Sequence, residues 1–326
     1  MNKTARLTAM LVFFILNAAA PAPAADRLAI VGSSTITDQA GRRIQVARPF
    51  TRFISLYGAH TENLFRLGLD REILGVSRHE AFPPRALEKP VFSYHDDAEK
   101  FLAARPDIVL IRPMIDGAYP QLIARLEKSG IAVVSLQPGT VEEMYRYWEI
   151  LGMLAGRRSK ARELTGCFKN AVDGFTGLTG NIAPKKRVYF EAVHRKMLTF
   201  APRAMAIFTL EAAGGVNIAA DARPVRGSNI AAYGKERILS RAAEIEVYLA
   251  QAGAMNRPTV SLIRDEPGFH IIKAVRESRI HIVDEKIVSR PTFRLLQGIH
   301  TIGTLLYPDA FGPAADEILK QANSCF

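Results

Sequence analysis

The sequence predicts an α/β protein made of two lobes that are joined by a long helical segment. Short strands that are almost wholly apolar alternate with amphipathic helices, which is typical of parallel sheets covered by helices on both faces. The alternation stops at a long helical stretch near the middle of the chain and then starts again. One spacing pattern recurs on both sides of that stretch. Together these observations predict two α/β lobes.

Residues 1–24 have the pattern of a secretory signal peptide. Lys3 and Arg6 precede an apolar run that is short for a membrane span, and small residues at 22–24 offer a cleavage site. A retained membrane anchor is the alternative. No cysteine follows the apolar run, which argues against lipid attachment at this site. We therefore expect a protein that is exported to the periplasm, released there and not lipid-anchored.

The first lobe is predicted over residues 25–155 and begins with a short leader at 36–46. Thr61 caps its first long helix and Gly68 helps to end it, while Pro106 separates a second helix from the strand that follows. The predicted strands are at 53–56, 108–111 and 131–136, and the predicted helices are at 61–68, 99–104 and 121–128.

The bridging helix is predicted over residues 156–183, within a longer helical stretch. Thr140 and Glu143 form a capping-box pattern, in which the two side chains satisfy free backbone donors at a helix N-terminus. Helical sequence then continues to about residue 173, with interruptions at Gly152 and Gly156.

The second lobe is predicted over residues 184–326, where the alternation restarts. Gly214 ends one of its helices, and Pro291 lies at the start of the last long helix, which stops before Pro308. The predicted strands are at 187–191, 244–249 and 280–283, and the predicted helices are at 205–213, 269–277 and 289–307.

An internal repeat supports two related lobes. Glu99 and a basic residue begin a short helix, and Asp107 then opens a strand. Glu236 begins the same pattern, with Glu244 as the second acid at the same spacing. Acidic residues favour helix N-termini anyway, so chance convergence is the alternative. Chance accounts for the whole spacing less well than common ancestry of the lobes.

The net charge indicates which class of partner the protein binds, and the two cysteines raise the question of a disulfide. The formal net charge of +11 over 326 residues favours an anionic partner, whereas export argues against nucleic acid. Cys167 and Cys325 could form one disulfide in an oxidising compartment. Cys167 lies in a helical pattern, however, so we expect it to pack as a small apolar residue, and the pairing stays open.

No motif of a known enzyme class is present. The sequence has no dinucleotide-binding glycine motif, phosphate loop, nucleophile elbow or zinc-protease motif. Its seven histidines are scattered. We therefore expect a protein that catalyses no reaction, and we assign it no metal site and no cofactor.

Aromatic rings, histidines and arginines gather just after the predicted strands. Ligands of open α/β sheets bind beyond the carboxyl ends of the strands. Rings can cover the faces of a large flat ligand, and guanidinium groups bind carboxylates or phenolates. For any single position, a solvated loop residue is the alternative. The candidate ligand-binding residues are Tyr57, His60, His79, Phe82, Tyr94, His95, Arg112, His194, Arg203, Arg226, Tyr233 and Arg290.

Several segments of the chain match a known pattern in their order and spacing. They are 52–62, the helix ending at Gly68, 75–77, 99–110, 210–217, 233–239 and 290–307. On these segments the chain resembles the periplasmic binding proteins for ferric siderophores, haem and cobalamin. The resemblance covers nearly all of the chain after the signal peptide, and the order and spacing of its motifs make the set specific.

That resemblance implies two Rossmann-like lobes joined by one rigid helix, with the ligand in the cleft between them and limited hinge motion. It also implies a partner, the membrane permease of an ABC importer with its ATPase subunit. One surface glutamate per lobe would dock onto permease arginines, and those residues correspond to Glu99 and Glu236. We expect the protein to act as a monomer and its ligand to be a metal chelate.

The residues favour an iron chelate over the other ligands of this family. Cobalamin carriers often place Trp around the cleft, whereas Trp148 is the only Trp here and falls in a predicted helix. Haem iron is held by an axial Tyr or His, and the candidates here are His60, Tyr94, His95 and His194. The arginines favour an anionic ferric chelate. A haem or cobalamin carrier remains the alternative, and an exported metal-cofactor enzyme on the same fold is the alternative from another class.

Overall fold

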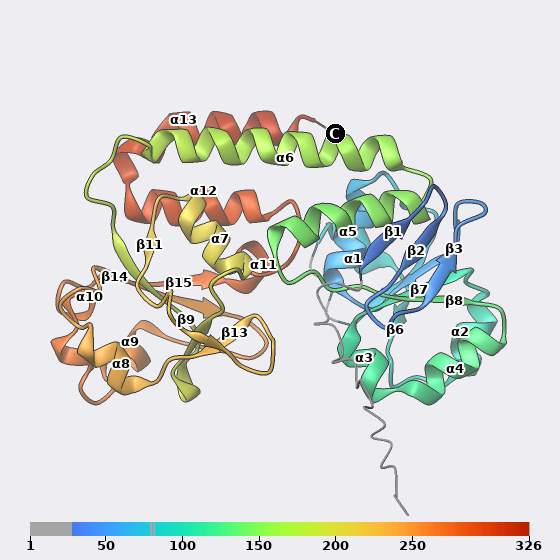
Figure 1. The fold of residues 1–326 in the computed structure, drawn as a ribbon, viewed down its shortest axis with the longest axis horizontal. Coiled ribbons are helices and arrows are strands. Elements are labelled where there is room, and N and C mark those ends of the chain that lie inside the picture. Colours follow the sequence, from blue (N-terminus) through green and yellow to red (C-terminus); the bar gives the residue numbers. More distant parts are fainter. Residues whose placement is uncertain (1–27, 79, 81, 326) are drawn as a thin grey trace, which may run out of the picture.

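The computed structural model describes residues 28–78, 80 and 82–325, so the predicted signal peptide lies outside the described residues. Figure 1 shows two α/β lobes side by side, with helix α6 (Arg158–Thr179) lying across both. The predicted fold class is therefore confirmed. Within the described residues, no helix is long and apolar enough to cross a membrane.

The first lobe is built on a parallel sheet with the strand order β6-β5-β4-β7-β8. Its interior strand β7 is wholly apolar and wholly buried, as expected for a strand covered on both faces. The strands are β4 (Phe53–Ser55), β5 (Ile73–Ser77), β6 (Val91–Phe92), β7 (Ile108–Ile111) and β8 (Ala132–Ser135). The helices are α1 (Gly58–Arg66), η2 (Pro84–Glu88), α2 (Ala98–Ala104), α3 (Pro113–Ala118), α4 (Pro120–Lys128) and α5 (Val141–Leu154).

The N-terminus of α5 contains part of the predicted capping box. Thr140 Oγ1 accepts a hydrogen bond from Glu143 N at 3.3 Å. The carboxylate of Glu143, however, accepts from Gly139 N at 2.7 Å. The chain therefore caps the helix with both predicted side chains, but the glutamate binds one residue further upstream.

A small antiparallel sheet lies where the sequence predicted only a leader. Its strands are β1 (Ala29–Val31), β2 (Thr35–Thr37) and β3 (Arg43–Gln45). Asp38, in the turn after β2, is fully buried and accepts a hydrogen bond from Ser135 N at 2.9 Å. This buried carboxylate ties the small sheet to the end of β8.

The predicted parallel-type sheet of the second lobe is extended on one side by antiparallel strands, so the sheet is mixed. Strands β9, β11, β14 and β15 run parallel, whereas β10, β12 and β13 join as antiparallel neighbours. The reason is local, because short turns connect β9 to β10 and β12 to β13. The strands are β9 (Arg187–Val193), β10 (Leu198–Phe200), β11 (Val216–Asn217), β12 (Arg223–Pro224), β13 (Ile230–Ala232), β14 (Val247–Ala252) and β15 (Ile280–Asp284).

The helices of the second lobe are shorter than predicted and more numerous. The expected helix at 269–277 is divided into η4 and α10, and the expected last helix begins only at residue 295. The helices are η3 (His194–Lys196), α7 (Met205–Ala212), α8 (Lys235–Ser240), α9 (Val260–Arg264), η4 (Phe269–Ile271), α10 (Lys273–Arg276), α11 (Glu285–Val288), α12 (Leu295–Leu306) and α13 (Pro308–Asn323).

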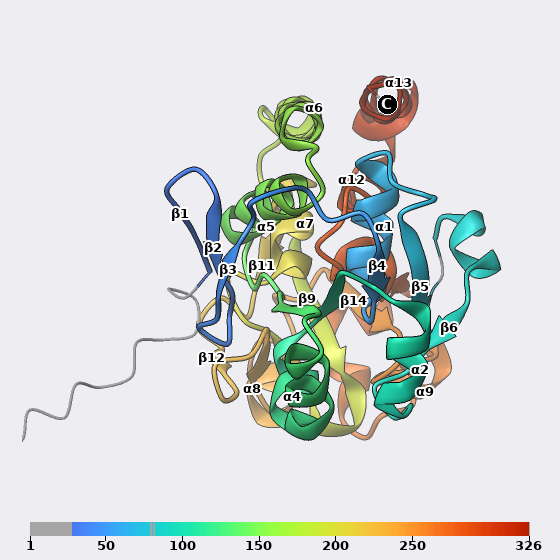
Figure 2. The same ribbon diagram turned by 90° about the vertical axis from the view of Figure 1, so that its right-hand side faces the viewer.

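Helix α13, which the sequence analysis did not predict, turns back from the second lobe and packs beside α6 (Figures 1 and 2). The two helices approach closely at Gly174, which has no side chain. A Cβ at this position would lie only 3.2 Å from Ile318 Cδ1. Cys325, just after α13, forms a disulfide with Cys167 on α6. The pairing that the sequence left open is therefore formed, and Cys167 is more than a small apolar residue packed in a helix.

One apolar core runs through both lobes and the bridge. It includes Phe53 of the first lobe, Phe168 of α6 and Leu296 of the second lobe, each with no more than 1% of its surface exposed. Trp148 lies in the same core and is fully buried, on a helix as predicted. A core shared in this way limits how far one lobe can move against the other.

The internal repeat is real in the structure, but its second acid is Glu246 rather than Glu244. Asp107 Oδ1 accepts from Arg52 N at 2.9 Å, immediately before β7 and β4 pair. Glu246 Oε2 accepts from Arg187 N at 3.0 Å, immediately before β14 and β9 pair. The second lobe thus has six residues between α8 and β14, whereas the first lobe has three between α2 and β7.

Candidate functional site

A cavity of about 1410 Å³ opens between the lobes. In the first lobe its walls come from the segments that follow β4, β5, β6, β7 and β8, at the carboxyl ends of the strands. In the second lobe they come from residues 200–206, the β12–β13 turn and the segments after β14 and β15. The site therefore lies where ligands of parallel sheets are generally bound.

Seven of the twelve predicted ligand-binding residues line this cavity. They come from both lobes, so the folded chain brings together side chains that are more than 200 residues apart. These seven are Tyr57, Tyr94, His95, Arg112, Arg203, Arg226 and Arg290.

Three of the predicted residues turn into the cores instead. His60 lies in the first turn of α1 and is fully buried. His194 and Tyr233 are also buried, with 3% and 6% of their surfaces exposed. Each follows a strand in the sequence, but none lines the cavity. Phe82 lies outside the cavity wall beneath the guanidinium of Arg294, and His79 falls outside the described residues.

Both ring nitrogens of His60 are hydrogen-bonded within the protein core. Its Nε2 lies 3.0 Å from Ile111 O, which only accepts, so Nε2 donates and Nδ1 accepts from Tyr147 OH at 2.7 Å. Burial lowers the pKa of His60 to about 4, and the positive charge of Arg112 adds to this effect. His60 is therefore a neutral core residue that links α1 to β7 and α5.

His194 belongs to a buried polar cluster in the second lobe. Its Nδ1 lies 2.8 Å from Glu191 Oε2, and its Nε2 lies 3.6 Å from Glu266 Oε2. The hydrogen bond to Glu191 raises the pKa of His194, and burial opposes that rise. The cluster compensates the charge of a fully buried glutamate, which explains why this histidine is not at the cavity.

Aromatic rings form the first-lobe side of the cavity. The guanidinium carbon of Arg112 lies 5.0 Å from the centre of the Tyr57 ring. Burial raises the pKa of the Tyr57 hydroxyl, although Arg112 and Arg290 lower it in part. Tyr94 packs against His95 with ring centres 4.5 Å apart, so both present ring surface in one small area. These rings can cover a face of a large ligand.

Arginines outnumber acids around the cavity. Glu143 and Glu285 are the carboxylates among the described lining residues, and both also bind backbone N–H groups. Arg203 lies 3.2 Å from Glu142, and Arg290 lies 3.9 Å from Glu285. The lining arginines are Arg78, Arg112, Arg203, Arg226 and Arg290. Because most of this charge is uncompensated, the cavity suits an anionic ligand.

Polar residues that the sequence analysis missed complete the walls. Gln39 extends from the small N-terminal sheet, and its side-chain amide donates to Gln137 O at 2.9 Å. Across the cavity, Asn229 approaches Gly139 so closely that a Cβ there would lie 3.2 Å from Asn229 Oδ1. Gln39, Gln137 and Asn229 have neither a charge nor an aromatic ring, so nothing in the sequence indicated that they would line the cavity.

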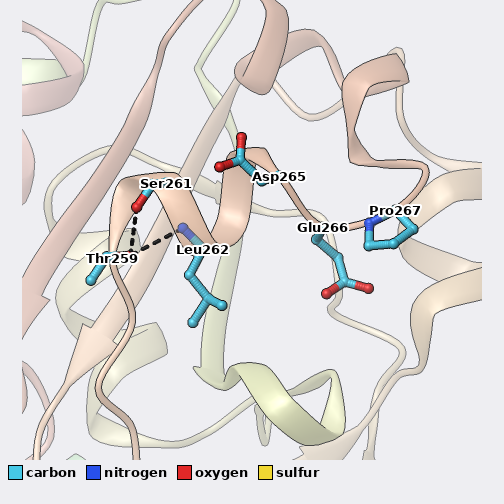
Figure 3. Close-up of a pocket in the computed structure, with 6 residues that line it drawn as sticks. All are labelled: Thr259, Ser261, Leu262, Asp265, Glu266 and Pro267. Carbon is cyan, nitrogen blue, oxygen red and sulfur yellow. Dashed lines mark hydrogen bonds between the residues drawn. The ribbon is translucent and has the colours of Figure 1, made fainter.

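A second, smaller hollow of about 370 Å³ lies beside α9 (Figure 3). In Figure 3 the carboxylates of Asp265 and Glu266 point in different directions. All of its walls come from residues 259–267 of a single lobe. The hollow gathers neither rings nor arginines, so the cavity between the lobes is the candidate site.

The two candidate docking glutamates occupy equivalent helices on different lobes. Glu99 lies in the first turn of α2, and 69% of its side chain is exposed although it pairs with Arg125 at 3.1 Å. Glu236 lies in the first turn of α8 and is also exposed. Both helices are anchored by a buried apolar residue two positions later, Phe101 and Ile238.

Comparisons with known proteins agree with this architecture. The family described as periplasmic binding protein matches residues 54–287. An uncharacterized ABC transporter substrate-binding lipoprotein of Bacillus subtilis is 25% identical, over 85% of this chain and 86% of that protein. A vitamin B12-binding protein of Vibrio cholerae is 23% identical, over 80% of this chain and 91% of that protein. The crystal structure of a possible iron-binding, periplasmic solute-binding protein from Staphylococcus epidermidis has a TM-score of 0.70 at 26% identity, over 80% of this chain and 100% of that one.

Proposed function

Because this chain belongs to the periplasmic binding protein family, we propose that it carries an anionic iron chelate to the permease of an ABC importer. Its general role is that of the substrate-binding component of such a transporter. The protein catalyses no reaction in this scheme. The iron is part of the transported chelate and is not a cofactor of the protein. Affinity comes from two largely preformed walls that enclose the ligand.

The observation that carries the choice of cargo is the set of arginines around the cavity. Five arginines face two glutamates there, and Arg78, Arg112 and Arg226 have no ion-pair partner among the described residues. A ferric complex of catecholate or carboxylate groups offers the matching negative charge. The rings of Tyr57 and Tyr94 would cover the organic part of such a ligand.

A corrinoid or haem cargo is the second candidate. The Vibrio cholerae relative is named a vitamin B12-binding protein, and it aligns with 80% of this chain. Haem propionates would also pair with the cavity arginines. The iron chelate is favoured because the single tryptophan, Trp148, is fully buried in the core and supplies no ring to the cavity. The matched relatives are binding and transport proteins, which favours either cargo over an enzymatic role.

Docking to the permease is proposed through Glu99 and Glu236. Each lies in the first turn of a short helix, one on each lobe, and each is exposed. One exposed ion pair contributes little to binding, but two anchors at a fixed separation act together and set orientation. We further propose that the mature protein is released into the periplasm, because the predicted cleavage site at residues 22–24 is not followed directly by the cysteine that lipid attachment there would use.

Native mass spectrometry and an optical spectrum of the protein purified from its own periplasm test the cargo. We expect an adduct with the absorption of a ferric catecholate or a related iron chelate. A haem or corrinoid spectrum would replace this proposal with the second candidate. If the protein emerges empty, titration with ferric tris-catecholate, haemin and cyanocobalamin decides between them, and binding of none would overturn all three.

A further inference from the structure

The turn between β12 and β13 has an unusual backbone for its sequence. Ser228 N donates to Val225 O at 2.9 Å, which closes a β-turn over residues 225–228. Its two central residues, Arg226 and Gly227, have φ angles of +51° and +66°. Positive φ at both central positions is the pattern of type I′ turns, which favour Asn, Asp and Gly. Gly227 fits this pattern, whereas Arg226 does not.

Arginine at the first central position costs conformational energy, because its Cβ crowds the backbone in the left-handed region. Nothing in the described residues offsets that cost within the protein. The side chain of Arg226 is exposed, and it has no ion pair, hydrogen bond or ring contact there. The turn would be more stable with Asn or Gly at this position.

The location of Arg226 supplies a reason for its presence. It is the only one of four non-glycine residues with positive φ in the described chain that lines the cavity. The others are Arg105, Met197 and Ser278. The same turn approaches the first lobe, since Asn229 lies against Gly139. Arg226 therefore stands where the second lobe reaches across the ligand space.

We propose that Arg226 is a specificity-determining residue, which binds an anionic group of the cargo from the second lobe. The left-handed turn presents its guanidinium to the cavity, and the protein retains arginine there at the expense of its own stability. This inference rests on the proposed function, because it assigns one charged group of the cargo to one residue. The ligand group is a carboxylate or a catecholate oxygen, both of which arginine binds well.

The test replaces Arg226 and measures stability and binding separately. Arg226→Asn should raise the thermal midpoint of the ligand-free protein by about 2 °C, because Asn tolerates the turn. It should also weaken binding of the triply anionic ferric tris-catecholate by about tenfold in a fluorescence titration. Binding of a neutral ferric tris-hydroxamate should change much less. Arg226→Lys, which retains the charge, should keep much of the affinity without the gain in midpoint.

Arg105→Asn is the matched control, since Arg105 is also exposed with φ of +51° but lies at the end of α2, outside the cavity wall. It should raise the midpoint and leave both affinities unchanged. Unchanged catecholate affinity in Arg226→Asn, with a wild-type protein that binds, would overturn this inference alone. So would an equal loss for both chelates. A wild-type protein that binds neither chelate would overturn the proposed cargo and this inference together.

Discussion

Glu62 and Arg294 join the two lobes through a two-point ion pair beside the cavity. Arg294 Nε donates to Glu62 Oε1 at 2.9 Å, and Arg294 Nη2 donates to Glu62 Oε2 at 2.7 Å. Glu62 belongs to α1 of the first lobe, whereas Arg294 immediately precedes α12 of the second. Next to this pair, Asn63 donates to Pro291 O at 2.9 Å. The segment that carries Arg290 into the cavity is therefore fixed to the opposite lobe.

Breaking this ion pair on one side should destabilise the protein strongly. Glu62 is only 5% exposed, so Arg294→Met removes the hydrogen-bonded partner of a buried charge and leaves only the weaker attraction of Arg66. We expect the free energy of unfolding to fall by about 3 kcal/mol in a urea titration. The double variant Glu62→Leu with Arg294→Met should recover most of that loss, because it removes both charges. A double variant no more stable than the single one would show that packing, not charge, causes the effect.

The buried state of His60 predicts a pH dependence of stability. Its pKa is about 4 in the folded protein, against about 6.5 in an unfolded chain. Between these values the unfolded state binds the additional proton. The free energy of unfolding should therefore fall as the pH decreases from 6.5 to 4, by up to about 3 kcal/mol. His60→Gln should remove this component of the slope, whereas His270→Gln, at an exposed position, should retain it.

The disulfide between Cys167 and Cys325 should contribute measurably to stability. It closes a loop with a sequence separation of 158 residues. We expect Cys325→Ser to lower the free energy of unfolding by about 2–4 kcal/mol under oxidising conditions. Cys167→Ser and the double variant should show about the same loss, since all three lack one bond. A reducing agent should bring the wild-type protein to the level of the variants and leave the variants unchanged.

Substituting both docking glutamates should separate transport from ligand capture. We expect Glu99→Ala with Glu236→Ala to abolish permease-dependent uptake and to leave ligand affinity nearly intact, because neither residue lines the cavity. Two other exposed glutamates, Glu163 on α6 and Glu317 on α13, give a matched double variant that should transport normally. Undiminished uptake by the Glu99 and Glu236 variant would contradict the docking assignment.

The buried strands were predictable because their apolar runs are strong local signals. Strand β7 and the start of α5 agree with expectation for this reason. Helix α13 escaped prediction because Pro308 ends α12 and at once begins the next helix, and Pro313 interrupts the pattern further. The strands of the small N-terminal sheet have three residues each, too few to show an alternation.

The candidate site was predictable in position but not in every side chain. Strand ends identify a cavity edge, which is why Arg112 and Tyr57 were found. Sequence does not show which way a side chain turns, and His60 lies within α1 facing Tyr147. Gln39 lies between β2 and β3, in a stretch predicted only as a leader, and it reaches the cavity wall through a contact with Gln137, 98 residues away, which no local pattern indicates.

The bond from Cys167 to Cys325 also determines how the protein would respond to mechanical force. Cys325 follows α13, and its partner Cys167 lies on α6. Tension applied between residue 28 and Cys325 would pass through the disulfide and bypass residues 168–324. The first lobe would then extend while the second, together with most of α6, carries no load. Pulled in an optical trap, the oxidised protein should release only the length of its first half, and the reduced protein should release all of it.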